Sequence, residues 1–207
     1  MREQLIKRYY ALLEKGLHPL VKSGVSPNAI SFLALVVSLS AGICYGYGKI
    51  FPGGLLLLLA GFMDTVDGTV ARLTGRSDRF GALLDSTLDR YAEFFVFFGL
   101  LFHFRNGGMF VIVLFALMGS VMVSYIKARA QSLGPVRTVG LMQRPERLAL
   151  LIAGSLINGP VETFIPDYPD AAFSASLILL ALLSNWTAAH RLLEGGKDLA
   201  SFPVDKE

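Results

Sequence analysis

Residues 55–89 read LLLLLAGFMDTVDGTVARLTGRSDRFGALLDSTLD, in which a strongly apolar run is followed by regularly spaced aspartates. The leucine-rich run is typical of a helix that crosses a membrane. Asp64 and Asp67 still lie within the length of that span. An ionised carboxylate near the centre of a bilayer costs about 2.5–3.5 kcal/mol on insertion scales, so acids at this depth indicate a functional site.

The aspartates fall into two pairs with helical spacing. Asp64 and Asp67 are three residues apart, and Asp85 and Asp89 are four apart, so each pair lies on one face of its helix. If the two helices pack side by side, the like charges converge and require a counter-cation. Ligands that are all oxygen select hard ions, so we expect Mg²⁺, Mn²⁺ or Ca²⁺, with Mg²⁺ favoured where a phosphate completes the shell.

The residues around the two pairs suit a phosphate ligand. Gly68 and Gly81 let a ligand approach the backbone closely, because glycine has no side chain. Arg72 supplies a guanidinium that binds phosphate through two parallel hydrogen bonds. The stretch therefore predicts a site for a metal ion together with a phosphate group.

Six segments approach the length of about 20 apolar residues that a membrane helix needs. The mean hydropathy of +0.54 agrees with this count. The sequence thus predicts an all-α integral membrane protein with six transmembrane helices. The single cysteine, Cys44, excludes a disulfide framework. The predicted spans are 28–48, 50–72, 82–104, 108–130, 146–165 and 171–192.

The basic residues predict the orientation of these spans. All Lys and Arg residues except Lys49 and Arg105 lie in the N-terminal segment, in the second and fourth loops with their adjoining helix ends, or in the C-terminal tail. Short loops rich in Lys and Arg stay on the cytoplasmic side. We therefore expect a multi-pass protein of the cell membrane, with both termini and the aspartate site on the cytoplasmic side.

Two other interpretations of the acids remain open. Exposed loop aspartates would account for Asp78, but they explain poorly four regularly spaced acids beside two apolar runs. Carboxylates that line an ion pathway would instead indicate a divalent-cation transporter. A transporter predicts acids spread across the depth of the membrane, whereas these acids gather toward the cytoplasmic ends of their helices.

The segment before the first apolar run has the pattern of an amphipathic helix. Its apolar residues recur at helical spacing with basic residues elsewhere on the wheel, as in a helix that lies in the membrane interface. A disordered basic tail is the alternative. We divide the chain into an amphipathic juxtamembrane segment at 1–24, a six-span domain at 25–194 and a cytoplasmic tail at 195–207. The apolar residues are Leu5, Tyr9, Leu12, Leu13 and Leu17.

The aspartate stretch resembles the signature of the CDP-alcohol phosphotransferases, DxxDGxxARx8GxxxDxxxD. The resemblance implies a six-span fold with an N-terminal juxtamembrane helix, a homodimer, an active site open laterally to membrane lipids, and two divalent ions. No nucleic acid partner is expected. The matching residues are Asp64, Asp67, Gly68, Ala71, Arg72, Gly81, Asp85 and Asp89.

The resemblance also implies a role for each part of the site. Asp64, Asp67 and Asp85 would bind metal, and Asp89 would lie near the metal and act as the general base on the acceptor hydroxyl. A carboxylate within hydrogen-bond reach can activate an alcohol in this way. Asp78 departs from the related synthases, which often carry Thr at that position. The residues on the CDP-lipid side would be Asn28, Ala29, Ile30, Ser31, Gly68, Arg72 and Asp78.

The alcohol acceptor must be sought among basic residues outside the signature. Lys127, Arg147 and Arg191 lie at three helix ends that would converge near one cavity, as an acceptor that carries a phosphate needs. A neutral acceptor such as serine would not need this cluster. The preference for positive charge on the cytoplasmic side explains Arg129 and Arg144 equally well.

The stretches SYIKARA at 124–130 and RPERL at 144–148 resemble the phosphatidylinositol-phosphate synthases of actinobacteria and similar archaeal enzymes. In those enzymes the residues that correspond to Lys127, Arg147 and Arg191 bind inositol phosphate. The resemblance implies transfer of a phosphatidyl or archaetidyl group from CDP-diacylglycerol or CDP-archaeol to inositol phosphate, with release of CMP.

Other acceptors and an inactive role stay open at this point. A phosphatidylglycerophosphate synthase would use glycerol 3-phosphate, and the basic residues do not separate the two acceptors because both carry a phosphate. An inactive paralogue that serves as a scaffold is a further alternative, which the complete signature does not favour.

Overall fold

The computed structural model describes residues 16–19, 21–75 and 78–201, and this part of the chain is helical with no strand. The predicted amphipathic helix lies mostly outside the described residues. Each of the six predicted spans overlaps one long helix. The long helices are α2 (Pro27–Gly46), α3 (Ile50–Leu73), α4 (Arg79–His103), α5 (Met109–Leu133), α6 (Arg144–Phe164) and α7 (Ala171–Ala200).

Four of the helices, α2, α3, α5 and α7, are long and apolar enough to cross a membrane. Many large apolar side chains face outward, and Leu182 and Trp186 are 66% and 69% exposed. Such a surface suits lipid rather than water as its surroundings. The chain is therefore a membrane protein. Helices α4 and α6 are less apolar because they carry charged residues, among them Asp85, Asp89 and Arg147.

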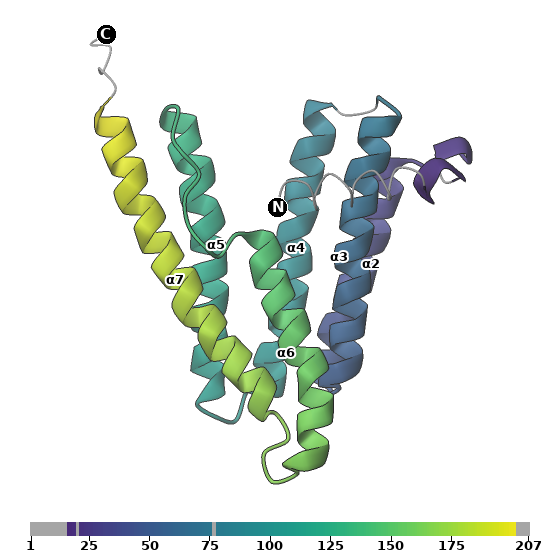
Figure 1. The fold of residues 1–207 in the computed structure, drawn as a ribbon, viewed down its shortest axis with the longest axis vertical. Coiled ribbons are helices and arrows are strands. Elements are labelled where there is room, and N and C mark those ends of the chain that lie inside the picture. Colours follow the sequence, from purple (N-terminus) through teal and green to yellow (C-terminus); the bar gives the residue numbers. More distant parts are fainter. Residues whose placement is uncertain (1–15, 20, 76–77, 202–207) are drawn as a thin grey trace.

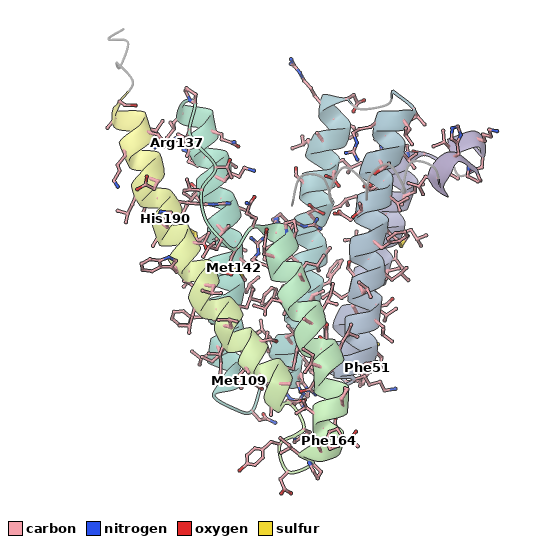
Figure 2. All side chains as sticks on the ribbon, in the orientation of Figure 1. Phe51, Met109, Arg137, Met142, Phe164 and His190 are labelled. Carbon is pink, nitrogen blue, oxygen red and sulfur yellow. The ribbon has the colours of Figure 1, made fainter. Side chains whose placement is uncertain are left out.

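The helices form two groups that α6 joins. Helix α2 packs against both α3 and α4, while α5 packs against α7, and α6 contacts α3 on one side and α7 on the other. The two groups spread apart toward the end of the bundle where α2 begins and α7 ends (Figure 1). Phe51, Met109 and Phe164 lie at the opposite end (Figure 2).

Two buried polar contacts anchor α6 at the end where the groups converge. The Tyr45 hydroxyl on α2 and the Ser155 hydroxyl on α6 lie 2.8 Å apart in a hydrogen bond. The Asn158 amide donates to the Pro169 carbonyl at 2.7 Å and accepts from the Phe173 amide at 3.1 Å. These bonds satisfy buried polar groups and fix the direction of α6, whose first turn reaches the aspartates.

Turn and capping residues mark the end of α3 and the start of α4. Gly75 follows α3 with a φ of 65°, in the left-handed region that glycine adopts without strain. Asp78 is the N-cap of α4, and its carboxylate accepts a hydrogen bond from the Gly81 amide at 2.6 Å. Aspartate and threonine are both suited to this capping position. Capping gives a physical role to the aspartate that stands where related synthases often have threonine.

Glycines bring the backbones of α2 and α4 into contact. A Cβ added at Gly42 would lie 2.2 Å from the Phe95 carbonyl oxygen, and one added at Gly99 would lie 1.9 Å from the Gly42 carbonyl oxygen. Small residues are the usual means of close helix packing in membranes. This contact sets how near α4, with Asp85 and Asp89, lies to α2.

We expect Gly42→Ala to destabilise the protein by about 1–3 kcal/mol, because the added methyl group must push α2 and α4 apart. The matched control is Gly196→Ala on α7, where an added Cβ meets nothing within 4 Å. Thermal unfolding of the purified protein in detergent measures both variants. Equal melting temperatures for the two variants would show that the α2–α4 contact does not limit stability.

Candidate functional site

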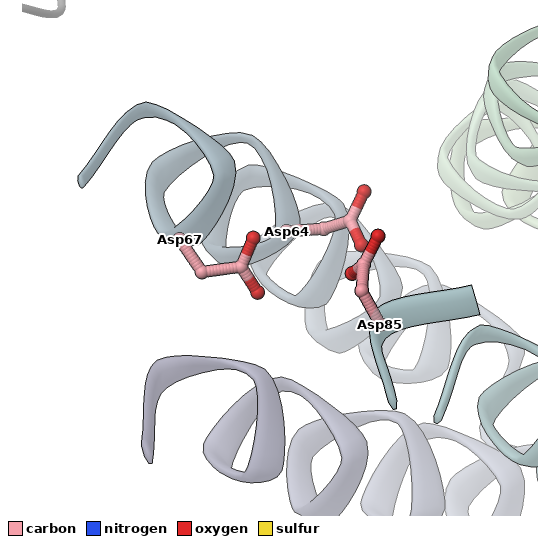
Figure 3. Close-up of side chains that lie close together, drawn as sticks. All are labelled: Asp64, Asp67 and Asp85. Atoms are coloured by element: carbon pink, nitrogen blue, oxygen red, sulfur yellow. The ribbon is translucent and has the colours of Figure 1, made fainter. Parts of the chain in front are cut away.

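Three aspartates from two helices form a compact cluster. Carboxylate oxygens of Asp64 and Asp67 on α3 and of Asp85 on α4 all lie within 4.8 Å of one another. Figure 3 shows the three side chains lying close together. The sequence argument supposed that the two helices pack side by side. In the structure α3 and α4 do not pack closely on each other, and each packs against α2 instead. The cluster therefore spans the space between α3 and α4.

The cluster fits a hard divalent cation. Its ligand atoms are all carboxylate oxygens, which Mg²⁺ and Mn²⁺ prefer. Asp67 is buried, and the Ser31 hydroxyl on α2 donates a hydrogen bond to its Oδ2 at 2.6 Å. Carboxylates this close repel one another unless a cation lies between them. A bound cation would therefore relieve a repulsion that the fold builds into the site.

Asp89 lies one helical turn beyond Asp85 and is paired with an arginine. The Arg144 guanidinium contacts Asp64 Oδ2 through Nη1 at 2.8 Å and Asp89 Oδ1 through Nη2. From the sequence, Arg144 fitted a contact to the acceptor phosphate and the general preference for positive charge on the cytoplasmic side equally well. Its position three residues before Arg147, on the same helical face, is the signal that would have placed it at this site.

Glu93 is a second residue of the site that the sequence reasoning missed. It follows Asp89 by four residues on α4, so both side chains point the same way. Its Oε1 accepts a hydrogen bond from the Ser120 hydroxyl on α5 and another from Arg147 Nη2 on α6 at 3.3 Å. Its Oε2 pairs with Arg90. The carboxylate thus ties α4 to the α5–α7 group, across the space where the two groups diverge.

A cavity of about 210 Å³ opens between α2, α3 and the start of α4. Five of the seven residues predicted for the CDP-lipid side line it. Of the other two, Ala29 is exposed and outside the lining, and Ile30 packs with Val66 and Val70 in a small apolar cluster. The five lining residues are Asn28, Ser31, Gly68, Arg72 and Asp78.

A second cavity lies on the other side of the aspartates. Its polar lining includes Asp64, Asp89, Glu93, Arg144 and Arg147, and its apolar lining reaches deeper into the bundle. The two cavities share the lining residues Ser31, Asp67 and Asp85. The geometry therefore offers two cavities that meet at the aspartate cluster, so that two ligands can approach one another there.

The three basic residues predicted for the acceptor do not line one cavity. Arg147 lines the cavity beside the aspartates, whereas Lys127 and Arg191 line a small pocket with Arg137. Arg191 donates to the Val139 carbonyl at 2.6 Å and to the Val123 carbonyl at 2.7 Å. These bonds hold the segment before α6 against α5 and α7. The Arg191 guanidinium, which was expected to lie near Arg147, is thus bound by backbone carbonyls instead.

We expect Ser31→Ala to weaken Mn²⁺ binding by about 10–100-fold, the usual effect of removing a hydrogen bond that orients a metal ligand. Mn²⁺ binding is measured by electron paramagnetic resonance on the purified protein without substrate. Ser40→Ala is the matched control, because Ser40 lies on the same helix and its hydroxyl donates to the Val36 carbonyl at 2.9 Å, within its own helix. An unchanged affinity in Ser31→Ala would contradict the role of Ser31 in holding Asp67.

Comparison with known proteins gives a consistent result at the level of the family. Residues 24–189 match the family model described as CDP-alcohol phosphatidyltransferase. The chain is 32% identical over 196 residues to the archaetidylinositol phosphate synthase of Methanothermobacter thermautotrophicus. The match covers 93% of this chain and 95% of that protein.

Solved structures of one bacterial enzyme share the fold. The crystal structure of Mycobacterium tuberculosis phosphatidylinositol phosphate synthase with CDP-DAG bound superimposes with a TM-score of 0.76 and 30% identity, over 97% of this chain and 98% of that one. The same enzyme in complex with manganese and citrate gives a TM-score of 0.77 and 29% identity, over 96% of this chain and 93% of that one.

Proposed function

This chain belongs to the CDP-alcohol phosphatidyltransferase family, and on that premise we propose that it transfers a phosphatidyl or archaetidyl group from a CDP-lipid to a hydroxyl of inositol phosphate. CMP is the second product, and the lipid enters phospholipid biosynthesis. The observation that carries this proposal is the pair of cavities that meet at Asp67 and Asp85. A donor in one cavity and an acceptor in the other would place their reacting atoms beside the carboxylates.

The cavity between α2, α3 and the start of α4 is the proposed site of the CDP-lipid. Gly68 leaves room for the backbone to approach the pyrophosphate, and Arg72 offers a guanidinium to its oxygens. Asn28 and Ser31 line the same cavity from α2 and would contact the cytidine end. Asp78 keeps its capping bond to Gly81, so it orders this wall of the cavity.

The proposed cofactor is Mg²⁺, replaceable by Mn²⁺, with two ions held by Asp64, Asp67, Asp85 and Asp89. The manganese complex of the related mycobacterial enzyme supports a divalent ion. Divalent ions supply charge neutralisation at the pyrophosphate, activation of its phosphorus and stabilisation of the leaving CMP. Removal of metal by EDTA should therefore abolish transfer, and added Mg²⁺ or Mn²⁺ should restore it.

Residues that line the second cavity would remove the proton from the acceptor and bind its phosphate. Asp89 lines the second cavity and would take the proton from the acceptor hydroxyl. The oxygen of that hydroxyl then forms a bond to the lipid-side phosphorus as the bond from phosphorus to CMP breaks. Arg147 lines the same cavity and would bind the acceptor phosphate, while Lys127 and Arg191 would contribute from the neighbouring pocket between α5 and α7.

Inositol phosphate is favoured over glycerol 3-phosphate because the related archaeal enzyme is named archaetidylinositol phosphate synthase and the related bacterial enzyme phosphatidylinositol phosphate synthase. Membership of an enzyme family favours catalysis over the alternatives of a cation transporter and an inactive scaffold. We also propose a homodimer with six spans and with both termini and the aspartate site on the cytoplasmic side. The proposed domain is 25–194, between a juxtamembrane segment at 1–24 and a tail at 195–207.

The acceptor is tested with the purified protein in lipid vesicles that contain CDP-diacylglycerol or CDP-archaeol and Mg²⁺. Label from inositol phosphate is expected in the lipid fraction, with CMP released in equal amount. Glycerol 3-phosphate and serine are the competing acceptors in parallel reactions. Equal or greater incorporation from either of them would overturn the assignment of inositol phosphate.

We expect Asp89→Asn to lower transfer by about 10²–10⁴-fold, the usual contribution of a general base. Binding of the CDP-lipid should change little, because Asp89 does not line the donor cavity. Asp167→Asn, an exposed acid between α6 and α7, is the control that should keep full activity. Retained turnover in Asp89→Asn would remove its assignment as the base.

A further inference from the structure

Arg144 bridges two carboxylates that belong to different helices. It is the first residue of α6, and its guanidinium pairs with Asp64 on α3 and with Asp89 on α4. The arginine side chain is 32% exposed, and those of Asp64 and Asp89 are 29% and 17% exposed. Arg144 is therefore partly open to the cavity and is not locked in the core.

Because Arg144 lies at the start of its helix, its positive charge is stabilised mainly by these carboxylates. A positive side chain in the first turn of a helix lies at the positive end of the helix dipole, which disfavours it. The guanidinium stays there because Asp64 and Asp89 neutralise it. A divalent cation at the aspartate cluster needs the carboxylate of Asp64, and the proposed two-ion site would use Asp89 as well. The cation and Arg144 would therefore compete for these two carboxylates.

Arg147, close to Arg144 at the start of α6, has a polar group that an anion in the cavity could bind. Arg147, one turn further along α6, is 3% exposed, with Nη1 bound to the Met142 carbonyl and Nη2 bound to Glu93. Its Nε is buried and has no hydrogen-bond partner among the described residues. A buried unpaired N–H of a cation is costly, and an anion in the cavity would satisfy it.

We propose that Arg144 is an exchangeable internal cation. It neutralises Asp64 and Asp89 while no divalent ion is bound, and it turns to the phosphate of the acceptor beside Arg147 when those carboxylates bind metal. Metal and acceptor phosphate then favour each other's binding. Bound metal frees Arg144 for the phosphate, and bound phosphate draws Arg144 away from the carboxylates that the metal needs. The phosphate half of this proposal rests on the proposed function, whereas the competition with metal does not.

Competition with metal is tested by Mn²⁺ titration of the purified full-length protein without lipid substrate, followed by electron paramagnetic resonance. Arg144→Gln should bind Mn²⁺ at least about fivefold more tightly than the unmodified protein, the low end of typical coupling between sites. Arg129→Gln is the matched control, since Arg129 lies exposed on α5 and forms hydrogen bonds with its neighbour Ser132. Arg144→Lys, which keeps the charge but not the two-pronged guanidinium, should fall between the two.

Equal or weaker Mn²⁺ binding in both Arg144 variants, with unchanged melting temperatures, would overturn the proposal. That result would mean that Arg144 holds the carboxylates in place for the metal and does not compete with it. The titration contains no substrate, so its failure leaves the proposed transfer reaction untouched. Conversely, failure of the inositol phosphate assay leaves the Mn²⁺ result standing.

The coupling is tested with inorganic phosphate as the probe. Calorimetric titration should show tighter phosphate binding to the Mn²⁺-loaded protein than to the metal-free protein, by about fivefold or more. Arg144→Gln should lose most of this difference, while Arg129→Gln should keep it. Phosphate can also contact the metal directly, so an undiminished difference in Arg144→Gln would overturn the coupling through Arg144.

Discussion

Repulsion among closely spaced carboxylates is the constraint around which this site is organised. Asp64, Asp67 and Asp85 bring oxygens within 4.8 Å of one another in a helix bundle with a largely apolar surface. Such a cluster is tolerable only with compensating positive charge or hydrogen bonds. The Ser31 hydroxyl and the Arg144 guanidinium supply both from two other helices. The aspartates therefore require a hydrogen-bond donor on α2 and a positive charge on α6.

Helix packing makes room for the ligands that this charge requires. Because α3 and α4 each pack on α2, the space between them stays open to a cation and to phosphate groups. The glycine contact at Gly42 and Gly99 draws α2 and α4 together, so that Ser31 lies at the wall common to both cavities. Packing of α4 on α2 rather than on α3 thus leaves the space between α3 and α4 open.

The second half of the site depends on α6. Its polar anchors at Ser155 and Asn158 fix it at the end where the helix groups converge. Its first turn carries Arg144 and Arg147 into the space where the groups diverge. Glu93 joins Arg147 to Ser120 across this space. One carboxylate outside the signature therefore links α4 to both α5 and α6.

The sequence by itself determined the long helices, the membrane environment, the two aspartate pairs and the family. Hydropathy and helical spacing are properties of neighbouring residues, and they need no knowledge of tertiary contacts. Only the tertiary structure decided that α2 lies against both α3 and α4, that Arg144 bridges Asp64 and Asp89, and that Arg191 binds backbone carbonyls apart from Arg147. The partners of a charged side chain at a helix end depend on how segments far apart in the chain pack, and nothing in the local pattern records that choice.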